Sequence, residues 1–426
     1  MSIAFEPLVA EPRPDPYPIY QRLRDEAPVH FAPRSQAFCV SRYDDVLHVL
    51  KHPEQFSSRA MQSALLPEMS PWDPGFMAGM LRFFWKVRLT PWRIARAIPL
   101  IAADPPRHEA MRGIVKRGFT PRTIAAWEPR IRELVEAQLA PARDGEPFDV
   151  VEDLAVPLPV TIIAELLGVE PERRVEFKRW SDAILQMLSG SVREGGSGAP
   201  LGDVVADLYV YLRATVRERR RRPGDDLVSV LVDPSHGVAM DEIELVQFVV
   251  LLLVAGNETT TNLIGNAASA LLDHPAELAL VAREPALVPA LVEEALRFDA
   301  PVQLLVREAV RDVELSGTRI PRGAVVVPLL GSANRDERRF PDAHRFRVGR
   351  DARGHLGFGF GIHFCLGAAL ARLEACVALE ALVPELARRT RVARPVEWVD
   401  SFLVRGRRHL PTTLASDARA AGRTPA

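Results

Sequence analysis

The sequence predicts a mainly α protein with a minor β portion, folded as one domain over residues 1–426. Helical patterns dominate from Pro105 to about Arg222. A longer helix is expected from Met240 to Leu272, and its middle, VQFVVLLLVAG, is apolar on every face, which is typical of a buried helix. Short strands cluster after residue 302. No internal repeat or clear linker divides the chain, so a single domain fits best.

The elements follow in order along the chain. The first 18 residues are rich in proline and are expected on the surface, and residues 29–42 alternate like a strand pair around a turn. Five prolines break any regular pattern from Ser57 to Asp104, the stretch from Ser189 to Pro200 is a glycine- and serine-rich connector, and Asp241 with Glu244 has the spacing of a capping box. The expected shorter helices are Tyr17–Glu26, Tyr43–His52, Pro105–Gly118, Pro121–Leu139, Val151–Leu167, Pro171–Leu188 and Asp203–Arg222.

Composition excludes several classes of protein. The 54 basic and 55 acidic residues give a net charge of −1, which does not favour nucleic acid, and the arginine run Arg217–Arg222 is interpreted as the basic end of a helix. Three cysteines are too few for a disulfide framework and indicate a reducing compartment. The N-terminus is unlike a signal peptide, and the apolar run Phe248–Gly256 is too short to cross a bilayer. We therefore expect a soluble, cytoplasmic protein with no membrane span.

One cysteine, Cys365, lies in the glycine-dense stretch GHLGFGFGIHFCLGAALAR, residues 354–372, before a helix expected over Leu366–Leu382. The positive end of a helix favours a thiolate. A lone thiol is more often an ordinary buried cysteine. Zinc would need further ligands nearby, where only His355 and His363 are found, whereas haem iron needs one axial protein ligand.

The residues around this cysteine carry a family resemblance. Phe358, Gly361, His363, Cys365 and Gly367 spell F-x-x-G-x-H-x-C-x-G, which resembles the haem-binding loop of the cytochrome P-450 superfamily, in particular its soluble bacterial members. The resemblance implies the cytochrome P-450 fold, with haem b (iron protoporphyrin IX) between the long central helix and the cysteine-loop helix. It also implies that Cys365 is the axial metal ligand and that Phe358 contacts the cofactor.

A second motif, AGNETT, places a carboxylate and hydroxyl groups in the most apolar part of the long helix. Such groups could simply satisfy an internal hydrogen bond or mark a kink. The resemblance implies instead that the motif faces the distal side of the haem. Ala255 and Gly256 would leave room for dioxygen beside the cofactor, while Glu258 and Thr259 would be catalytic residues that help to deliver protons.

Two further sets of residues match the same family. Glu294 and Arg297 share one helix face; alone they would be an exposed ion pair, but the resemblance implies a buried structural pair. His108 and Arg112, one helical turn apart in DPPRHEAMR, are family-matched contacts of a haem propionate. Arg307 and His355 match the other propionate positions.

The resemblance implies a monooxygenase that inserts one oxygen atom from O2 into an apolar small molecule: a fatty acid, terpenoid, steroid or polyketide-like compound. The chain contains neither a dinucleotide-binding fingerprint nor an iron–sulfur cysteine set, so a separate ferredoxin and ferredoxin reductase are expected to supply the electrons to a monomeric enzyme. Two alternatives remain: a peroxide-driven haem-thiolate hydroxylase, against which the acid–alcohol pair argues, and a non-catalytic haem-based gas-binding protein.

The sequence says less about which substrate the protein recognises. The resemblance implies that residues 63–101 cover the pocket and select the substrate. This region includes the basic, aromatic segment 72–98, and Ala78–Ile98 is expected to act as a mobile lid. Its arginines and lysine could bind an anionic substrate group or could be ordinary solvated charges. The family-matched candidates for the remaining pocket walls are Leu304, Leu305, Val306, Phe402 and Leu403.

Overall fold

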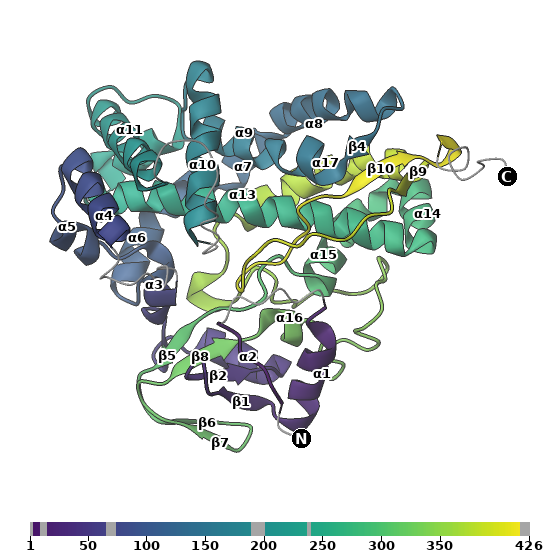
Figure 1. The fold of residues 1–426 in the computed structure, drawn as a ribbon, viewed down its shortest axis with the longest axis horizontal. Helices are drawn as coiled ribbons and strands as arrows, with labels where there is room; N and C mark the ends of the chain where they lie inside the picture. The colour runs from purple at the N-terminus through teal and green to yellow at the C-terminus, as the bar shows by residue number, and fades with distance from the viewer. Residues whose placement is uncertain (1–2, 9–14, 65–73, 189–200, 237–239, 418–426) are drawn as a thin grey trace. The chain divides into compact units, whose positions relative to one another are not determined.

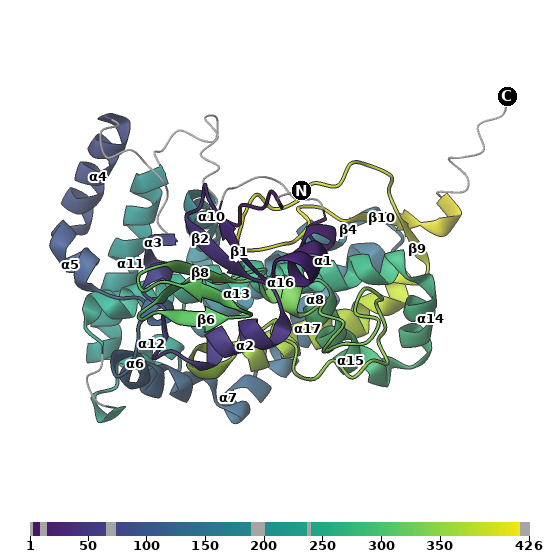
Figure 2. The same cartoon turned by 90° about the horizontal axis from the view of Figure 1, so that it is seen from below.

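The computed structural model describes residues 3–8, 15–64, 74–188, 201–236 and 240–417 (Figures 1 and 2). The chain divides into two compact units. The first comprises Met1–Ser57, Pro121–Pro159 and Glu258–Ala426, and the second comprises Ser58–Thr120 and Val160–Asn257. Each unit is therefore assembled from segments that are distant in sequence, and the prediction of one domain over the whole chain stays a prediction.

The main sheet of the first unit has five strands in the order β1-β2-β8-β5-β3. The predicted hairpin is confirmed: β1 pairs antiparallel with β2, and β2 pairs parallel with β8, so that Ala37 lies opposite Val325. Helix α2 packs beside this sheet (Figures 1 and 2) over an apolar core that includes Phe56 and Phe340. The elements are α1 Tyr17–Glu26, β1 Val29–Ala32, β2 Ala37–Val40, α2 Tyr43–Lys51, β3 Phe56–Ser57, β5 Arg307–Ala309, β8 Val325–Pro328 and α16 Leu330–Ala333.

The other part of the first unit is mainly helical. Helix α17 packs against α7, α8, α14 and α15, and a small sheet in the order β4-β10-β9 joins residues from the middle and the end of the chain. Two predicted helices are each divided. The helix predicted over Pro121–Leu139 breaks before Trp127, and in the one predicted over Val151–Leu167 a π-helical turn, η3, precedes a new helix that begins at Pro157. The elements are α7 Pro121–Ala125, α8 Glu128–Arg143, β4 Phe148–Asp149, η3 Val150–Ala155, α14 Pro275–Arg283, α15 Val288–Phe298, β6 Val313–Leu315, β7 Thr318–Ile320, α17 Ala368–Leu386, β9 Arg389–Arg391 and β10 Pro411–Leu414.

The second unit is helical, with α11 packed along α4, α10 and α12. The prediction that residues 57–104 lack regular structure is wrong, because the described residues of this range include the helices α3, α4 and α5. Pro74 and Pro91 are the first residues of α4 and α5, where a missing backbone N–H costs no helical hydrogen bond. The predicted connector 189–200 and Trp72 lie outside the described residues. The helices are α3 Ala60–Ala64, α4 Pro74–Val87, α5 Pro91–Arg96, α6 Arg107–Val115, α10 Arg174–Leu188, α11 Leu201–Arg221 and α12 Leu227–Val232, and α9 Pro157–Leu166 spans the boundary with the first unit.

The long helix α13 runs over Glu242–Asp273. Its capping box is confirmed, because Asp241 Oδ1 accepts the N–H of Glu244 at 2.9 Å and Glu244 Oε2 accepts the N–H of Asp241 at 2.8 Å. The expectation that every face is buried is wrong, since Ala255 is exposed and Gly256 is half-buried. The helix as a whole is long and apolar enough to cross a membrane, although its most apolar stretch is half buried inside the protein, as in a core helix.

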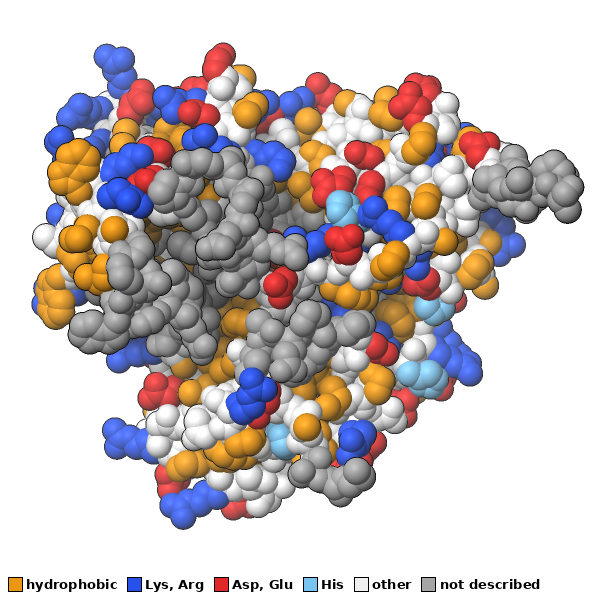
Figure 3. Space-filling model, in the orientation of Figure 1, with side chains coloured by type: hydrophobic (Ala, Val, Ile, Leu, Met, Phe, Trp, Pro, Cys, Tyr) orange, Lys and Arg blue, Asp and Glu red, His pale blue; other side chains and the backbone are white. Residues whose placement is uncertain are grey.

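Several arginines near the basic end of α11 form ion pairs. Near the basic end of α11, Arg213 and Arg217 bind the carboxylate of Glu242 at 2.7 and 2.9 Å, and Arg219 binds Asp226. This supports the interpretation of the arginine run as a helix end. On the face shown in Figure 3, cationic and anionic side chains are interspersed, as the net charge of −1 suggests.

Candidate active site

The cysteine loop is held in shape by its own backbone. Cys365 is half-buried and follows a 3-10 turn over Gly361–His363; its N–H donates to the carbonyl oxygen of Phe358 at 2.9 Å. Gly361 has φ +72°, and a Cβ at this residue would lie 2.6 Å from the carbonyl oxygen of Leu50, so a side chain cannot be accommodated there. Helix α17 begins at Ala368, two residues later than predicted. The thiol therefore lies just outside the helix start, on a loop fixed by close backbone packing.

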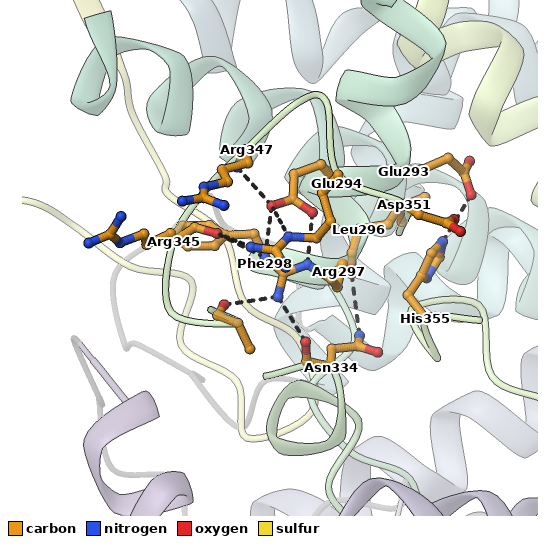
Figure 4. A network of polar contacts seen from close by, with 12 residues as sticks. Glu293, Glu294, Leu296, Arg297, Phe298, Asn334, Arg345, Arg347, Asp351 and His355 are labelled. Carbon is orange, nitrogen blue, oxygen red and sulfur yellow. Dashed lines mark hydrogen bonds and ion pairs between the residues drawn. The ribbon is translucent and has the colours of Figure 1, made fainter. Parts of the chain in front are cut away.

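A polar cluster of His355, Glu293 and Arg372 packs against the first residues of the Cys365 loop. His355 Nδ1 accepts the N–H of Gly357 at 3.0 Å, so Nε2 carries the ring proton and donates to Glu293 Oε2 at 3.0 Å (Figure 4). Arg372 of α17 binds Glu293 at 2.6 Å, and its guanidinium lies 4.5 Å from the centre of the Phe358 ring. Burial raises the pKa of Glu293, but hydrogen bonds from His355 and Arg372 outweigh it and lower the pKa to about 2.

This arrangement bears on the predicted propionate contact of His355. Both of its ring nitrogens already have partners, so a contact with a propionate requires one of these hydrogen bonds to be exchanged. The role of His355 at the haem stays a prediction. Glu293 and Arg372 were not identified from the sequence, although Glu293 directly precedes Glu294 and Arg372 lies on the helix that follows the cysteine.

The predicted structural ion pair is confirmed as buried. Glu294 and Arg297 of α15 have no exposed side-chain surface, and two parallel hydrogen bonds of 2.7 and 2.8 Å join them (Figure 4). Arg297 also donates to the carbonyl oxygens of Asn334 and Ala343, and Glu294 accepts the N–H of Arg347. The pair thus ties α15 to the chain between β8 and the cysteine loop, which is a structural role.

In the AGNETT motif on α13, Asn257 has different surroundings from Glu258 and Thr259. Asn257 is buried and donates to Ser181 Oγ at 3.1 Å, so an internal hydrogen bond explains it. Glu258 and Thr259 are half-buried. Burial raises the pKa of Glu258 to about 7, and the charge of Arg408 opposes this rise. The acid therefore titrates near neutral pH.

The two small residues of the motif also differ. Ala255 is exposed on α13, in keeping with a helix face that another group could approach. A Cβ on Gly256 would meet Ile163 Cδ1 of α9 at 2.3 Å. Close packing of α9 on α13 is therefore sufficient to explain the glycine, and its predicted place beside the cofactor stays a prediction.

The remaining predicted cofactor ligands lie on α6 and β5. In the second unit His108 is buried, and burial, followed by the charge of Arg112, lowers its pKa, which favours the neutral imidazole. In the first unit Arg307 is buried on β5, with Nη1 2.9 Å from the carbonyl oxygen of Val306. Buried cationic and neutral N–H donors of this kind suit carboxylates such as haem propionates.

The segment expected to be a lid is helical and packed. Arg82 and Lys86 of α4 approach Asp203 and Asp207 of α11 at 3.6 and 2.7 Å. These two cations therefore serve helix packing. The motion of the segment and its binding of an anionic substrate group stay predictions. Trp85 and Trp92 are 82% and 64% exposed, so the segment presents large apolar side chains to the surface.

The residues present fit a haem better than a clustered metal ion. Among the described residues no group of three or more His, Cys, Asp or Glu side chains could hold a metal, whereas the Cys365 loop offers a single thiol close to Gly357 and Gly361, which have no room for a Cβ. One thiolate is the protein ligand that a haem-thiolate centre requires. This loop, the buried E-x-x-R pair and the acid–alcohol pair on the longest helix together fit a haem-thiolate centre.

Comparisons with known proteins place the chain in a family. The family model "Cytochrome P450" matches residues 145–387. The erythromycin C-12 hydroxylase of Saccharopolyspora erythraea is 43% identical over 74% of this chain and 80% of its own. The structure of cytochrome P450 CYP109Q5 from Chondromyces apiculatus is 41% identical, covers 94% of this chain and 95% of its own, and has a TM-score of 0.79.

A third structure, of CYP109E1 from Bacillus megaterium in complex with testosterone, is 34% identical, covers 94% of this chain and 99% of its own, and has a TM-score of 0.78. The chain belongs to the cytochrome P450 family. It is a P450 monooxygenase with the family's fold and uses haem b as its cofactor.

Proposed function

We propose that this P450 hydroxylates a bulky apolar small molecule of the steroid or macrolide type in the cytoplasm. In the balanced reaction, one oxygen atom of O2 enters a C–H bond of the substrate and the other is reduced to water by two electrons and two protons. A separate ferredoxin with its reductase supplies the electrons, as bacterial P450s generally use ferredoxin-type partners. Support for the substrate class comes from the relative that hydroxylates erythromycin and the structural neighbour bound to testosterone.

The geometry of the Cys365 loop is the observation that carries this proposal. When bound, haem b supplies the redox and oxygen-activating chemistry. Cys365 would be the thiolate that holds it, from a loop in which the Cys365 N–H already donates to Phe358, so little ordering would be needed on binding. Phe358 would flank the ligand, and His108, Arg112, Arg307 and His355 would hold the propionates.

Glu258 and Thr259 would deliver the protons that the reaction consumes. A carboxyl group that titrates near pH 7 can both give and accept a proton at neutral pH, which is the condition for efficient general acid–base catalysis. The hydroxyl group of Thr259, on the next residue of the same helix, would position the water molecule that receives the proton. Ala255 would leave the space that oxygen needs. Half-buried Leu305, Phe402 and Leu403 would contribute apolar walls for the substrate.

The ligand assignment is tested with Cys365→His. The parent protein in its ferrous–CO form should show the red-shifted Soret band of a thiolate complex, and the variant should lose that band while still binding haem. Cys376→Ser, which changes a thiol whose pKa is raised to about 11 by burial, serves as the matched control and should keep the band. A red-shifted band in Cys365→His would contradict the assignment.

The proton-delivery role is tested with Thr259→Ala. The variant should bind substrate normally and consume reduced nicotinamide through ferredoxin and its reductase, yet release more peroxide and about 10²-fold less hydroxylated product. Thr260→Ser, a conservative change at the buried neighbour, should stay coupled. Unchanged coupling in Thr259→Ala would count against the role, and a parent protein that uses peroxide far better than O2 with ferredoxin would favour the peroxide-driven alternative.

A further inference from the structure

Helix α4 has one face that packs on α11 and an opposite face that carries apolar side chains. The two helices lie side by side within the second unit (Figures 1 and 2), and the rings of Phe83 and Tyr209 meet edge-on between them, with their centres 5.5 Å apart. Met77, Leu81 and Trp85 are spaced by four residues, so they follow one another at successive turns along the other face.

This second face is exposed. Met77, Leu81 and Trp85 are 40%, 66% and 82% exposed, and Trp92 of the neighbouring α5 is 64% exposed. Single apolar side chains on a protein surface are ordinary. A stripe with two tryptophans is not, because each such ring has about 150–250 Å² of area to bury. We refer to these four residues as the α4–α5 face, and its composition indicates a surface that binds a partner.

The sequence around the α4–α5 face supplies only positive charge. Residues 74–103 include five arginines and lysines and no Asp or Glu. Two of the five cations, Arg82 and Lys86, are neutralised by aspartates of α11. The positive charge of the other three is left for a partner.

These three cations are Arg88, Arg93 and Arg96, and all are exposed. Within the described part of the chain, no carboxylate forms an ion pair with any of them. The guanidinium of Arg96 lies 4.6 Å from the centre of the Trp92 ring, and a guanidinium stacked in this way keeps N–H groups at its edge for an acceptor. Hydrophobic and cationic side chains adjoin over α4 and α5 at the left edge of Figure 3.

This combination of side chains favours a lipid surface over other partners. Guanidinium groups bind phosphate oxygens, and tryptophan rings favour the boundary between lipid headgroups and acyl chains. The apolar residues form a stripe along a helix, which a fluid lipid surface can accept without a partner of complementary shape. A basic helix with tryptophan and leucine on its apolar face is typical of segments that lie on anionic membranes.

We propose that the α4–α5 face binds the surface of an anionic phospholipid bilayer. The two tryptophans and Leu81 enter the headgroup layer, and the three exposed arginines contact the lipid phosphates. The binding is peripheral and reversible, so it requires no membrane-spanning helix. It is independent of the reaction proposed above, because none of these residues is assigned a part in haem binding or proton delivery.

Vesicle flotation with the holoenzyme tests this proposal. Vesicles of equal parts phosphatidylglycerol and phosphatidylcholine should carry the protein at low salt, and pure phosphatidylcholine vesicles should bind it at least tenfold less, since each cation near an anionic surface strengthens binding about fivefold. Salt at about 0.5 M should weaken the binding by screening. Replacing the two most exposed residues of α4 together, Leu81→Ser with Trp85→Ser, should lower the affinity at least tenfold.

Two matched controls separate the α4–α5 face from general surface effects. Val175→Ser changes a residue of α10 that is also 82% exposed, and it should leave vesicle binding unchanged. The second control removes three exposed arginines at or just beyond the end of α11 and should keep the binding, whereas removal of the three arginines near the face should abolish most of it. The two triple variants are Arg220→Gln, Arg221→Gln, Arg222→Gln and Arg88→Gln, Arg93→Gln, Arg96→Gln.

Each variant should keep the ferrous–CO spectrum and melting temperature of the parent, which shows that it is folded. A parent protein that does not float with the phosphatidylglycerol vesicles would overturn the proposal, as would equal binding by the face variants and their controls. Sedimentation equilibrium tests a protein partner. If the parent ignores vesicles but self-associates, and Leu81→Ser with Trp85→Ser abolishes the association, the face is an interface between copies and the proposal is wrong.

Discussion

Glu374 shows what burial does to a single carboxyl group in this protein. It lies on α17 with almost no exposed surface, and burial raises its pKa to about 8 from its ordinary value of 4.5. Its Oε2 has no hydrogen-bond partner within the described part of the chain. The folded protein therefore binds one more proton than the unfolded chain between pH 4.5 and 8, and the contribution of this group to stability falls as the pH rises through that window.

The matching prediction concerns Glu374→Gln, which keeps the shape and removes the ionisation. Relative to the parent, the variant should gain stability as the pH rises, by roughly 3 kcal/mol at pH 7. Urea unfolding of both holoproteins between pH 5 and 8 measures the difference. The exposed Glu133→Gln should show no comparable trend. A constant difference between parent and Glu374→Gln across this range would contradict the prediction.

At the same scale, the sequence identifies site residues only where the signal is local. Cys365 was identified because its glycines and neighbouring aromatic residue stand within ten positions of it. Glu293 and Arg372 were not, because each is brought to the other by folding: Arg372 is 79 positions from Glu293. Neither residue type nor spacing reveals such a pair before the elements that carry them are packed.

Among elements, α15 is the one whose ion pair has the largest predicted effect. Glu294→Gln removes the charge that faces a fully buried Arg297 and should cost about 3–5 kcal/mol of stability, since an unpaired buried charge remains. Glu133→Gln breaks a pair with the same i,i+3 spacing on an exposed face of α8 and should cost less than about 1 kcal/mol. Thermal unfolding and the haem-to-protein absorbance ratio measure both, and equal losses in the two variants would be inconsistent with burial as the cause.

Helix boundaries were predicted less well than helix positions. The first helix, Tyr17–Glu26, was predicted to the residue because apolar periodicity and proline coincide there. Residues 57–104 were misjudged because their prolines were interpreted as breaks, whereas Pro74 and Pro91 start helices. Proline indicates a boundary in both cases, and only the packing of α4 against α11 decides on which side of it the helix lies.

For the whole molecule, the fold class could be predicted because helical periodicity is a local property of the chain. The division into two units could not, because segments such as 58–120 and 160–257 are joined by packing and not by adjacency in sequence. The capping box of α13 was predicted, yet the incomplete burial of its apolar middle was not, since it depends on which neighbours cover the helix.

Haem removal is the test that belongs to this scale. A ligand that binds the folded chain and not the unfolded chain stabilises it by about 4 kcal/mol when its concentration is 1,000 times its Kd. The apoprotein should therefore melt at a lower temperature than the holoprotein, and added haem should raise its Tm in a concentration-dependent manner. Calorimetry of both forms measures this effect. Identical melting of the apoprotein with and without haem would mean that the folded state does not depend on the cofactor.

The small sheet in which β10 pairs with β4 cannot form until nearly the whole chain has been synthesised. Phe148 meets its partner Thr412 across 264 positions of sequence. At typical translation rates of about 5–20 residues per second, β4 waits roughly 13–50 seconds after leaving the ribosome before its neighbour has been made. During that interval its hydrogen-bonding edge is open to other nascent chains. Slower initiation, lower temperature or a chaperone that shields this edge should therefore raise the yield of correctly assembled enzyme, and a chain that stops short of Leu414 never completes the sheet.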